Sequence, residues 1–417
     1  MESLASQFGL ELRSAVQRNI SPITKLAFQL FGLCFTSVLF LSCNANSQNQ
    51  ISATDSKDVE LIAVEEIKPS KLSDVVDSIS YTRLEYHPDH RARRIDKVII
   101  EDGFVYTFDY SFGKSLSVYS LDGSFQFAIT NPGQGPNEYR AVHDFLVDKG
   151  KIEILDIGGK MLFFDEQGAF ERSIKLPFSA QAFIKIGDDY LFQTGKKLNE
   201  LGRNGNSCEV IQYNLESKKT DCLLEINNDR RINGSWEKDM LKRVGNEYYY
   251  ATGFNDTIYS KQDGYFSPRF IMDFSLNGLP EEIFDKNVSV GEFVQFQSNN
   301  PEKFYHSAGI QVSSDFLITR YSSDGLHHLI YDFKKRNKAA LEFRVKNDVD
   351  GGLPIPFTYV LNNRDIIVVY DSEYVLGRAS ELQKEKNQFS KKEQAFLDFA
   401  NKLDTDSSLA MISYHLK

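Results

Sequence analysis

The sequence is poor in several residue types that mark particular classes of protein. Its 417 residues include one Trp, eleven Pro and four Cys. Two of the cysteines, Cys34 and Cys43, lie in or beside an N-terminal apolar stretch, so a disulfide-rich scaffold is excluded. The formal net charge is -10, and no basic stripe is present to follow a phosphate backbone. We therefore expect no nucleic-acid partner.

Familiar catalytic motifs are also missing. The sequence has no Gly-x-Ser-x-Gly elbow, no His-Glu-x-x-His, no phosphate-binding glycine loop followed by Lys, and no cysteine placed as a nucleophile. The seven histidines are scattered. His327 and His328 are adjacent in a strand pattern, so their rings should point to opposite faces and not chelate one ion together.

Aromatic residues are abundant. There are 32 Phe and 20 Tyr, and 41% of the residues are hydrophobic. Planar side chains pack well on a pleated, half-buried surface, so this composition favours strands. The chain is long enough to bury a sizeable core.

The N-terminus has the order of a secretory signal. The charge-free run 26–42 follows Arg18 and Lys25 and precedes a polar segment. Its end, Leu39 to Cys43, resembles a bacterial lipobox, although Phe40 stands where Leu is usual. A plain transmembrane anchor is the alternative. We expect a signal peptide over 1–43, lipidation at Cys43, and a flexible tether over 44–65. The protein would then lie at the cell envelope, in contact with membrane only through its lipid anchor.

The two remaining cysteines are Cys208 and Cys222. If the segments around them form a hairpin that turns near Ser217, the two sulfurs do not lie directly opposite each other. A disulfide needs Cα atoms within roughly 7 Å. The spacing therefore disfavours a bridge.

Internal repeats are the most informative feature. Gly103 and Gly150 each open an alternating strand and are 47 residues apart, as are Asp109 and Asp156 at the strand ends. Four weaker copies follow, near residues 187, 245, 314 and 363. The average interval is about 52 residues, which is the length of a four-stranded propeller blade.

The repeats predict an all-β fold over 66–417, a six-bladed β-propeller with four-stranded antiparallel blades. Strands at 75–84 and 409–416 have no blade of their own, so we expect them to complete the last blade together and close the ring. Between them, 381–403 has apolar residues at spacings of three and four. It predicts an amphipathic helix that lies on the propeller.

Three stretches carry a resemblance to a known family. They are 131–139, 254–259 and the Lys-Leu-Ser-Asp sequence at 71–74. With them, the chain resembles the six-bladed β-propeller lipoproteins abundant in the Bacteroidetes, which are relatives of NHL-repeat propellers. In the first stretch Asn137 replaces the usual glycine. The resemblance implies this fold and an exported location, and it implies no reaction.

The loop in the first of these stretches is the best candidate for ligand binding. Its glycines allow main-chain N–H groups to approach an anion or a sugar hydroxyl closely. The candidate ligand-binding residues are Gly133, Gly135, Glu138, Tyr139, Arg140, His143 and Asp144. The alternative, which we favour, is that the loop needs Gly and Pro only to lead from one blade to the next.

Acidic residues at strand ends could hold Ca²⁺ near the axis. They are Asp109, Asp144, Asp148, Asp156 and Asp165. Asp also commonly ends a strand by bonding the backbone, and no compact calcium loop is present, so we expect no metal or other cofactor.

The function predicted from the sequence is an envelope-anchored binding or scaffold propeller for a protein or a glycan, without catalysis. The alternative is a hydrolase or lyase with a carboxylate or metal site at the channel mouth, acting on a carbohydrate or lactone. The aromatic residues at 248–250 and 293–296 are conceivable contacts.

Overall fold

The computed structural model describes residues 59–65, 67–87, 94–110, 112–195, 199–202, 205–225, 232, 240–284, 288–307, 309–356, 358–404 and 409–417. From Ser56 onward the chain forms one compact unit. The predicted signal peptide, Cys43 and residues 44–58 of the predicted tether lie outside the described residues.

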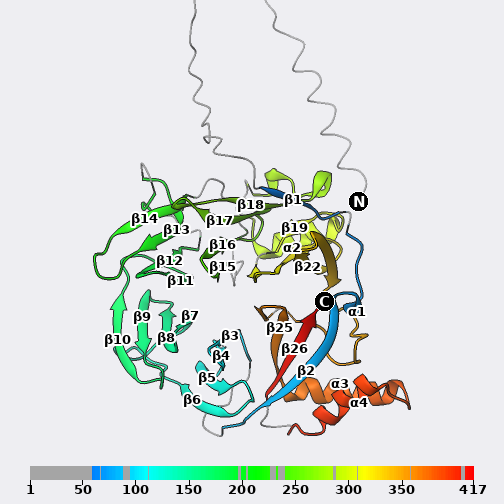
Figure 1. The fold of residues 1–417 in the computed structure, drawn as a ribbon. Coiled ribbons are helices and arrows are strands. Elements are labelled where there is room, and N and C mark those ends of the chain that lie inside the picture. The colour runs from blue at the N-terminus through cyan, green and yellow to red at the C-terminus, as the bar shows by residue number, and fades with distance from the viewer. Residues whose placement is uncertain are drawn as a thin grey trace, which may run out of the picture. The chain divides into compact units, whose positions relative to one another are not determined.

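Six sheets surround a central axis, so the predicted six-bladed propeller is confirmed (Figure 1). Blade 1 contains β3 (Lys97–Glu101), β4 (Phe104–Asp109), β5 (Ser115–Ser120) and β6 (Phe125–Ile129). Blade 2 contains β7 (Val142–Asp148), β8 (Lys151–Asp156), β9 (Lys160–Phe164) and β10 (Phe170–Lys175). Blade 3 contains β11 (Ala182–Ile186), β12 (Asp189–Gln193), β13 (Cys208–Tyr213) and β14 (Thr220–Glu225).

The other three blades follow the same plan, with additions. Blade 4 contains β15 (Leu241–Val244), β16 (Glu247–Tyr250), β17 (Thr257–Gln262), β18 (Tyr265–Asp273) and β1 (Glu60–Ala63). Blade 5 contains β19 (Tyr305–His306), β20 (Gln311–Val312), β21 (Phe316–Ser322), β22 (Leu326–Asp332) and β23 (Asn337–Glu342). Blade 6 contains β24 (Val360–Asn362), β25 (Asp365–Asp371), β26 (Leu409–Leu416) and β2 (Val76–Leu84).

In the part of the chain that the structure describes, helices are few and lie in the connections. They are α1 (Leu72–Val75), η4 (Ser275–Asn277), η5 (Glu281–Ile283), α2 (Val290–Asn299), α3 (Ser372–Glu385) and α4 (Lys391–Ala400). In each blade neighbouring strands run in opposite directions from the inner strand outward, except that the added β1 of blade 4 runs parallel to β18. The loops between second and third strands and the connections between blades therefore emerge on one face, here called the crossover face.

Tight hairpin turns between strands account for the repeat found in the sequence. In blade 1, Asp102 and Gly103 both have positive φ, at 47° and 85°, and Lys149 and Gly150 repeat this in blade 2 at 54° and 76°. Two successive positive φ values are the geometry of a type I′ turn, whose twist suits a two-residue hairpin. The 47-residue spacing found in the sequence is thus the distance from one such turn to the next.

The core consists of apolar clusters, one between each pair of neighbouring blades. Strand alternation produces them. In β4, Val105 packs against blade 6, while Tyr106 and Phe108 pack against blade 2. Each blade therefore depends on both neighbours for burial, and the ring is stable only when it is closed.

Closure combines the two chain ends, as expected from the isolated terminal strands. The N-terminal β2 is the outer strand of blade 6 and pairs along its whole length with the C-terminal β26, from Val76 opposite Leu416 to Leu84 opposite Leu409 (Figure 1). On its other side β26 pairs with β25. Backbone hydrogen bonds between β2 and β26 thus close the ring.

The ordered body begins earlier than the sequence analysis placed it. Residues 60–63, assigned above to the flexible tether, form β1 and pair in parallel with β18 of blade 4. Ile62 is buried in the cluster between blades 4 and 5, and Lys338 donates to the carbonyl of Ala63 at 2.6 Å. The short Leu-Ile-Ala run forms an edge strand because the outer edge of β18 is available to pair with it. The polar sequence around the run gives no sign of this pairing.

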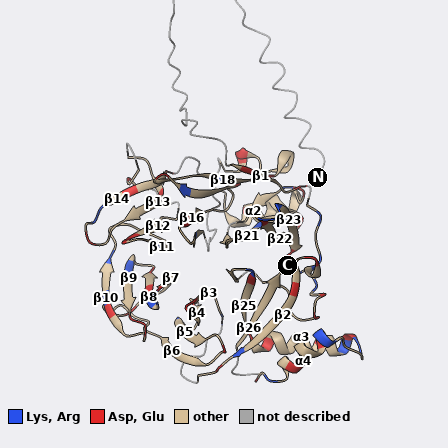
Figure 2. Cartoon of the chain, viewed as in Figure 1, with Lys and Arg blue, Asp and Glu red and all other residues tan. Residues whose placement is uncertain are grey.

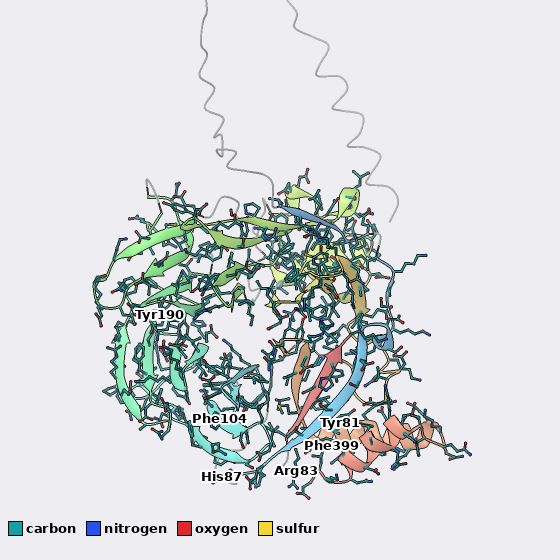
Figure 3. All side chains as sticks on the ribbon, viewed as in Figure 1. Tyr81, Arg83, His87, Phe104, Tyr190 and Phe399 are labelled. Carbon is teal, nitrogen blue, oxygen red and sulfur yellow. A yellow bond between two sulfur atoms is a disulfide. The ribbon has the colours of Figure 1, made fainter. Side chains whose placement is uncertain are left out.

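The predicted helix over 381–403 is instead a pair of helices, α3 and α4, inserted between β25 and β26. Ser390 begins α4 with a capping box, in which it exchanges hydrogen bonds with Glu393. Phe399 stacks on Tyr81 of β2 with ring centroids 4.9 Å apart, so the pair packs on blade 6 (Figure 3). The sequence contains this Ser-x-x-Glu capping signal at Ser390 and Glu393, but the prediction of one continuous helix placed it in the helix interior.

The expectation against a disulfide is wrong. Cys208 and Cys222 are bonded, with Cα atoms 5.8 Å apart. The ladder between β13 and β14 shifts register on both sides of Val210, so the two cysteines approach although neither is the ladder partner of the other. A bulge changes which side chains can meet, and sequence spacing alone does not reveal it.

Loss of this disulfide should lower stability. Cys222→Ser opens a closed loop of about 15 residues, and loops of that length contribute about 3 kcal/mol. We expect a lower melting temperature for the variant in oxidising buffer. With excess reductant the wild-type protein should melt like the variant, and a wild type that still melts higher would contradict this account.

A buried carboxylate lies between blades 2 and 3. Glu153 accepts a hydrogen bond from the Tyr190 hydroxyl at 2.9 Å, and the Lys185 ammonium lies 3.8 Å away (Figure 3 labels Tyr190). Burial raises the pKa of Glu153, and these two partners offset the effect only in part. At pH values between the pKa of Glu153 in the unfolded chain and its higher pKa in the folded protein, the folded protein retains a proton that the unfolded chain has released.

Stability should consequently decrease as pH rises through the folded pKa of Glu153, because only the unfolded chain gains the full benefit of ionisation. We expect Glu153→Gln to flatten the fall in melting temperature as pH rises above about 4.5, the ordinary pKa of a Glu side chain. Glu166→Gln, at an exposed turn, is the matched control and should keep the wild-type slope. Equal slopes in both variants would exclude Glu153 as the source.

Candidate binding surface

The predicted glycine loop connects β6 to β7, and its polar groups bond to one another. The Glu138 carboxylate accepts the N–H of Gly135 at 2.8 Å. A side chain at Gly133 would lie 2.0 Å from that carboxylate, which explains the glycine there. Tyr139 is buried, and its hydroxyl donates to the carbonyl of Lys114 at 2.5 Å. The geometry of the loop is that of a connection between blades.

Arg140, the next candidate, attaches the same connection to blade 2. Its N–H donates to the Asp156 carboxylate at 2.7 Å, and the N–H of Gly158 donates to the other oxygen of Asp156 at 2.7 Å. Asp109 has the same role in blade 1. Asp109 and Asp156 thus tie the second strands of blades 1 and 2 to the loops of the crossover face.

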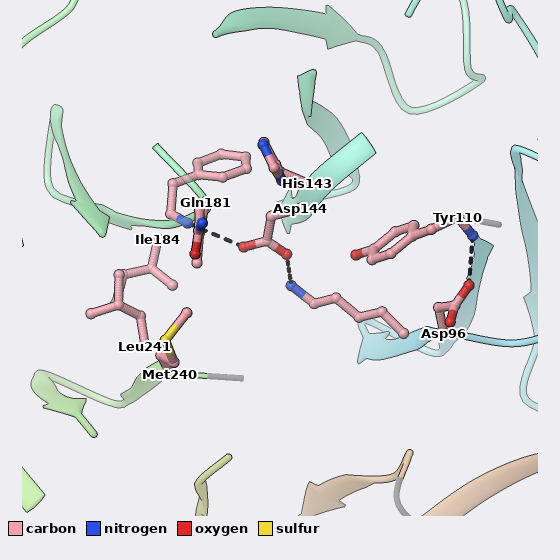
Figure 4. Close-up of a pocket in the computed structure, with 11 residues that line it drawn as sticks. Asp96, Tyr110, His143, Asp144, Gln181, Ile184, Met240 and Leu241 are labelled. Carbon is pink, nitrogen blue, oxygen red and sulfur yellow. Dashed lines mark hydrogen bonds and ion pairs between the residues drawn. The ribbon is translucent and has the colours of Figure 1, made fainter. Parts of the chain in front are cut away.

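His143 and Asp144 lie at the mouth of the central channel, beside the inner strands of blades 1 to 4 (Figure 4). Asp144 accepts hydrogen bonds from Lys97 at 2.5 Å and from the N–H of Phe183 at 3.1 Å. It therefore links blades 1, 2 and 3. The pocket here is about 40 Å³, which is room for two or three water molecules at about 15 Å³ each.

A larger groove lies on the crossover face between blades 6 and 1, with a volume of about 560 Å³. Residues from separate segments line it: Arg94, Ile95, Phe112, Phe343, Pro356, Thr358, Val369, Tyr370, Asp371, Tyr374 and Leu409. Phe112 is 62% exposed and Tyr374 is 68% exposed. Two exposed aromatic rings beside one groove are unusual, since such rings are normally covered.

Buried hydrogen bonds hold the groove in shape. Asp109 is fully buried, and its carboxylate accepts the N–H groups of Arg94 at 3.2 Å, Phe112 at 2.8 Å and Gly113 at 2.9 Å. On the opposite wall the Tyr370 hydroxyl donates to the carbonyl of Pro354 at 2.6 Å. Phe112 is therefore carried by a turn that is fixed before any ligand binds, and Tyr374 lies in the first turn of α3, which Asp371 caps.

The charged groups of the groove already have partners. The Arg94 guanidinium lies 3.0 Å from the Asp96 carboxylate. Asp371 accepts the N–H of Glu373 at 2.9 Å and caps α3. Acidic and basic residues are also interspersed along the described strands (Figure 2). The groove is thus best suited to a ligand without net charge.

The other acidic candidates are distributed around the ring. Asp148 pairs with Lys185 at 2.6 Å, and Asp165 accepts the N–H groups of Gln167 and Ala169 within its own turn. Among the described residues, no group of three or more His, Cys, Asp or Glu is arranged to hold a metal ion. Within the same residues, no helix is both long enough and apolar enough to cross a membrane.

The aromatic residues proposed as contacts from the sequence are mostly internal. Tyr248, Tyr249, Tyr250 and Phe293 are buried. His327 and His328 are buried as well, and burial lowers the pKa of His328 to about 3. Phe112 and Tyr374 were not among the contact residues expected from the sequence. The sequence pattern that marks Phe112 is weak, since it consists only of a position in a short turn with Gly113, after the Asp that ends a strand.

These features define a class, that of six-bladed propellers with a preformed groove on the crossover face. The chain belongs to the family described as a domain of unknown function, DUF4934, whose model matches residues 58–406. No curated protein sequence matches it.

Two solved structures from Bacteroides are similar to it. A Bacteroides fragilis protein described as exported has a TM-score of 0.66 at 15% identity, covering 86% of this chain and 99% of that one. A member of the DUF4221 family from Bacteroides vulgatus has a TM-score of 0.49 at 9% identity, covering 82% and 97%. The first likeness supports the fold alone.

Asp109→Asn should disturb the groove, because an amide NH₂ would then face backbone N–H donors. We expect a loss of about 2 kcal/mol or more in the free energy of unfolding, since buried donors lose their acceptor. Urea unfolding measures this. Asp102→Asn, in an exposed turn, is the control and should leave stability unchanged within about 0.5 kcal/mol.

Proposed function

We propose that this protein is a binding propeller of the cell envelope, anchored by lipid at Cys43, which holds a protein or glycan ligand in the groove between blades 6 and 1. The observation that carries the proposal is the pair of exposed rings, Phe112 on a turn held by the buried Asp109 and Tyr374 in the first turn of α3. Specific binding favours such preformed, aromatic-lined concave sites.

The chemistry of the groove favours a neutral ligand with flat apolar faces. Its aromatic rings offer stacking surfaces, and its single Arg and single Asp are both engaged. A charged ligand would have to separate one of these pairs and would lose affinity. A neutral glycan and an apolar segment of a protein both satisfy this condition, and the experiment below distinguishes them.

The channel mouth supports catalysis less well. Both of its carboxylates are engaged, Asp144 by Lys97 and backbone N–H groups and Asp96 by Arg94 and the N–H of Tyr110. The adjoining pocket of about 40 Å³ has no room for a sugar ring. We therefore prefer binding in the groove to hydrolysis or lyase chemistry at the channel mouth.

The test is a binding screen of the chain from Ser56 onward against neutral oligosaccharides and apolar peptides. For any probe that binds, Phe112→Ala and Tyr374→Ala should each weaken affinity roughly 5- to 30-fold, equivalent to about 1–2 kcal/mol for a stacked ring. Tyr265→Ala removes a half-exposed ring from the outer strand of blade 4 and should have no effect. Binding that ignores both groove variants would refute the site.

A further inference from the structure

A second constellation lies away from the groove, on the three strands that close the ring. His415 of β26 stands between Ser80 of β2 and Asp365 of β25 (Figure 1 shows these strands). Its Nε2 atom lies 3.0 Å from the Ser80 hydroxyl oxygen, and its Nδ1 atom lies 2.7 Å from the Asp365 carboxylate. A hydroxyl, an imidazole and a carboxylate are thus connected in series.

Strand register explains why the three side chains meet. His415 is directly opposite Asp365 in the ladder between β25 and β26. On the other side Ser413 is opposite Ser80, so His415 is the diagonal neighbour of Ser80 on the same sheet face. The contact joins residues 335 and 50 positions apart in the chain.

The partners fix the direction of the hydrogen bonds. A carboxylate only accepts, so the Nδ1 atom of His415 carries the proton that bonds to Asp365. In the neutral ring the Nε2 lone pair then faces the Ser80 hydroxyl and accepts its proton. The side chains of His415 and Asp365 are each 35% exposed, and Ser80 is exposed, so a small reagent has access.

The N–H of Tyr81 is the candidate donor for a developing oxyanion, and strand alternation indicates its direction. The N–H of Leu416 donates to the carbonyl of Arg364, toward the β25 side, and successive residues of a strand direct their N–H groups to opposite sides. The backbone of Ser413 is thus expected to face β2, where its ladder partner is Ser80, and the same alternation directs the N–H of the next residue, Tyr81, to the outer edge of the sheet. The residue after a nucleophile is a common source of an oxyanion donor.

We propose that Ser80 is an activated nucleophile that accepts acyl groups from small esters, with His415 as the general base and Asp365 as the positioning residue. The Ser80 oxygen bonds to the ester carbonyl carbon while its proton passes to the Nε2 atom of His415. The bond from carbon to the alkoxide then breaks, and His415 returns the proton to the departing alcohol.

Water completes the cycle. His415 takes a proton from water, the water oxygen bonds to the acyl carbon, the bond to Ser80 breaks, and Ser80 regains its proton as the carboxylic acid leaves. No oxidant or metal is required. The site is separate from the groove and does not depend on the proposed binding function.

The experiment is covalent labelling of the full chain by a fluorophosphonate, which forms a phosphorus–oxygen bond with an activated serine and releases fluoride. Mass spectrometry of peptides should place the label on Ser80. His415→Ala should slow labelling at least about 100-fold, because general-base catalysis contributes that much. Asp365→Asn should slow it too, and Asp365→Glu should restore part of the rate, which a purely structural carboxylate would not do.

Ser413→Ala is the matched control, since it removes a neighbouring hydroxyl from the same face and should leave labelling unchanged. Melting temperatures of all variants identify any that fail to fold. If folded wild-type protein acquires no label at Ser80, or if labelling proceeds equally fast in folded His415→Ala, the proposal is overturned.

Discussion

Pairing between the N-terminal β2 and the C-terminal β26 is the constraint on which the rest of the molecule depends. Each blade buries one apolar face against each neighbour, so an open ring would leave two such faces in water. The eight residues of β26 prevent this by bonding to β25 on one side and to the N-terminal β2 on the other. Segment 60–76 reinforces the closure, because Ile62 and Leu72 are buried in the two clusters on either side of blade 5.

Closure of the ring also brings together the residues of the groove and the side chains of Ser80, His415 and Asp365 on blade 6. Val369, Tyr370 and Leu409 belong to closing strands, and Phe112 and Arg94 belong to the first blade after the junction. The groove therefore lies where the ring is fastened. Blade 6 carries a helical pair in place of a short loop, and α3 places Tyr374 at the surface, whereas Phe112 lies in a turn of blade 1.

The repeated Asp residues suggest a metal site in the sequence but have a structural role in the folded protein. Asp109 and Asp156 end equivalent strands and accept N–H groups from the loops of the crossover face. Their carboxylate oxygens are buried and already accept hydrogen bonds from these N–H groups. They therefore hold the loops in place and do not come together around an ion. Asp144 likewise links three inner strands. Asp109 also holds the turn that carries Phe112 at the proposed groove.

The sequence by itself determined the blades, because turn residues such as Asp102-Gly103 and alternating strands are local signals with a short period. It also indicated which terminal strands close the ring. Only the tertiary structure decided the groove, the disulfide between Cys208 and Cys222, and the contact of His415 with Ser80. These depend on register shifts and on residues up to 335 positions apart. Such contacts carry no periodic signature, since each follows from how separate strands align once the ring has formed.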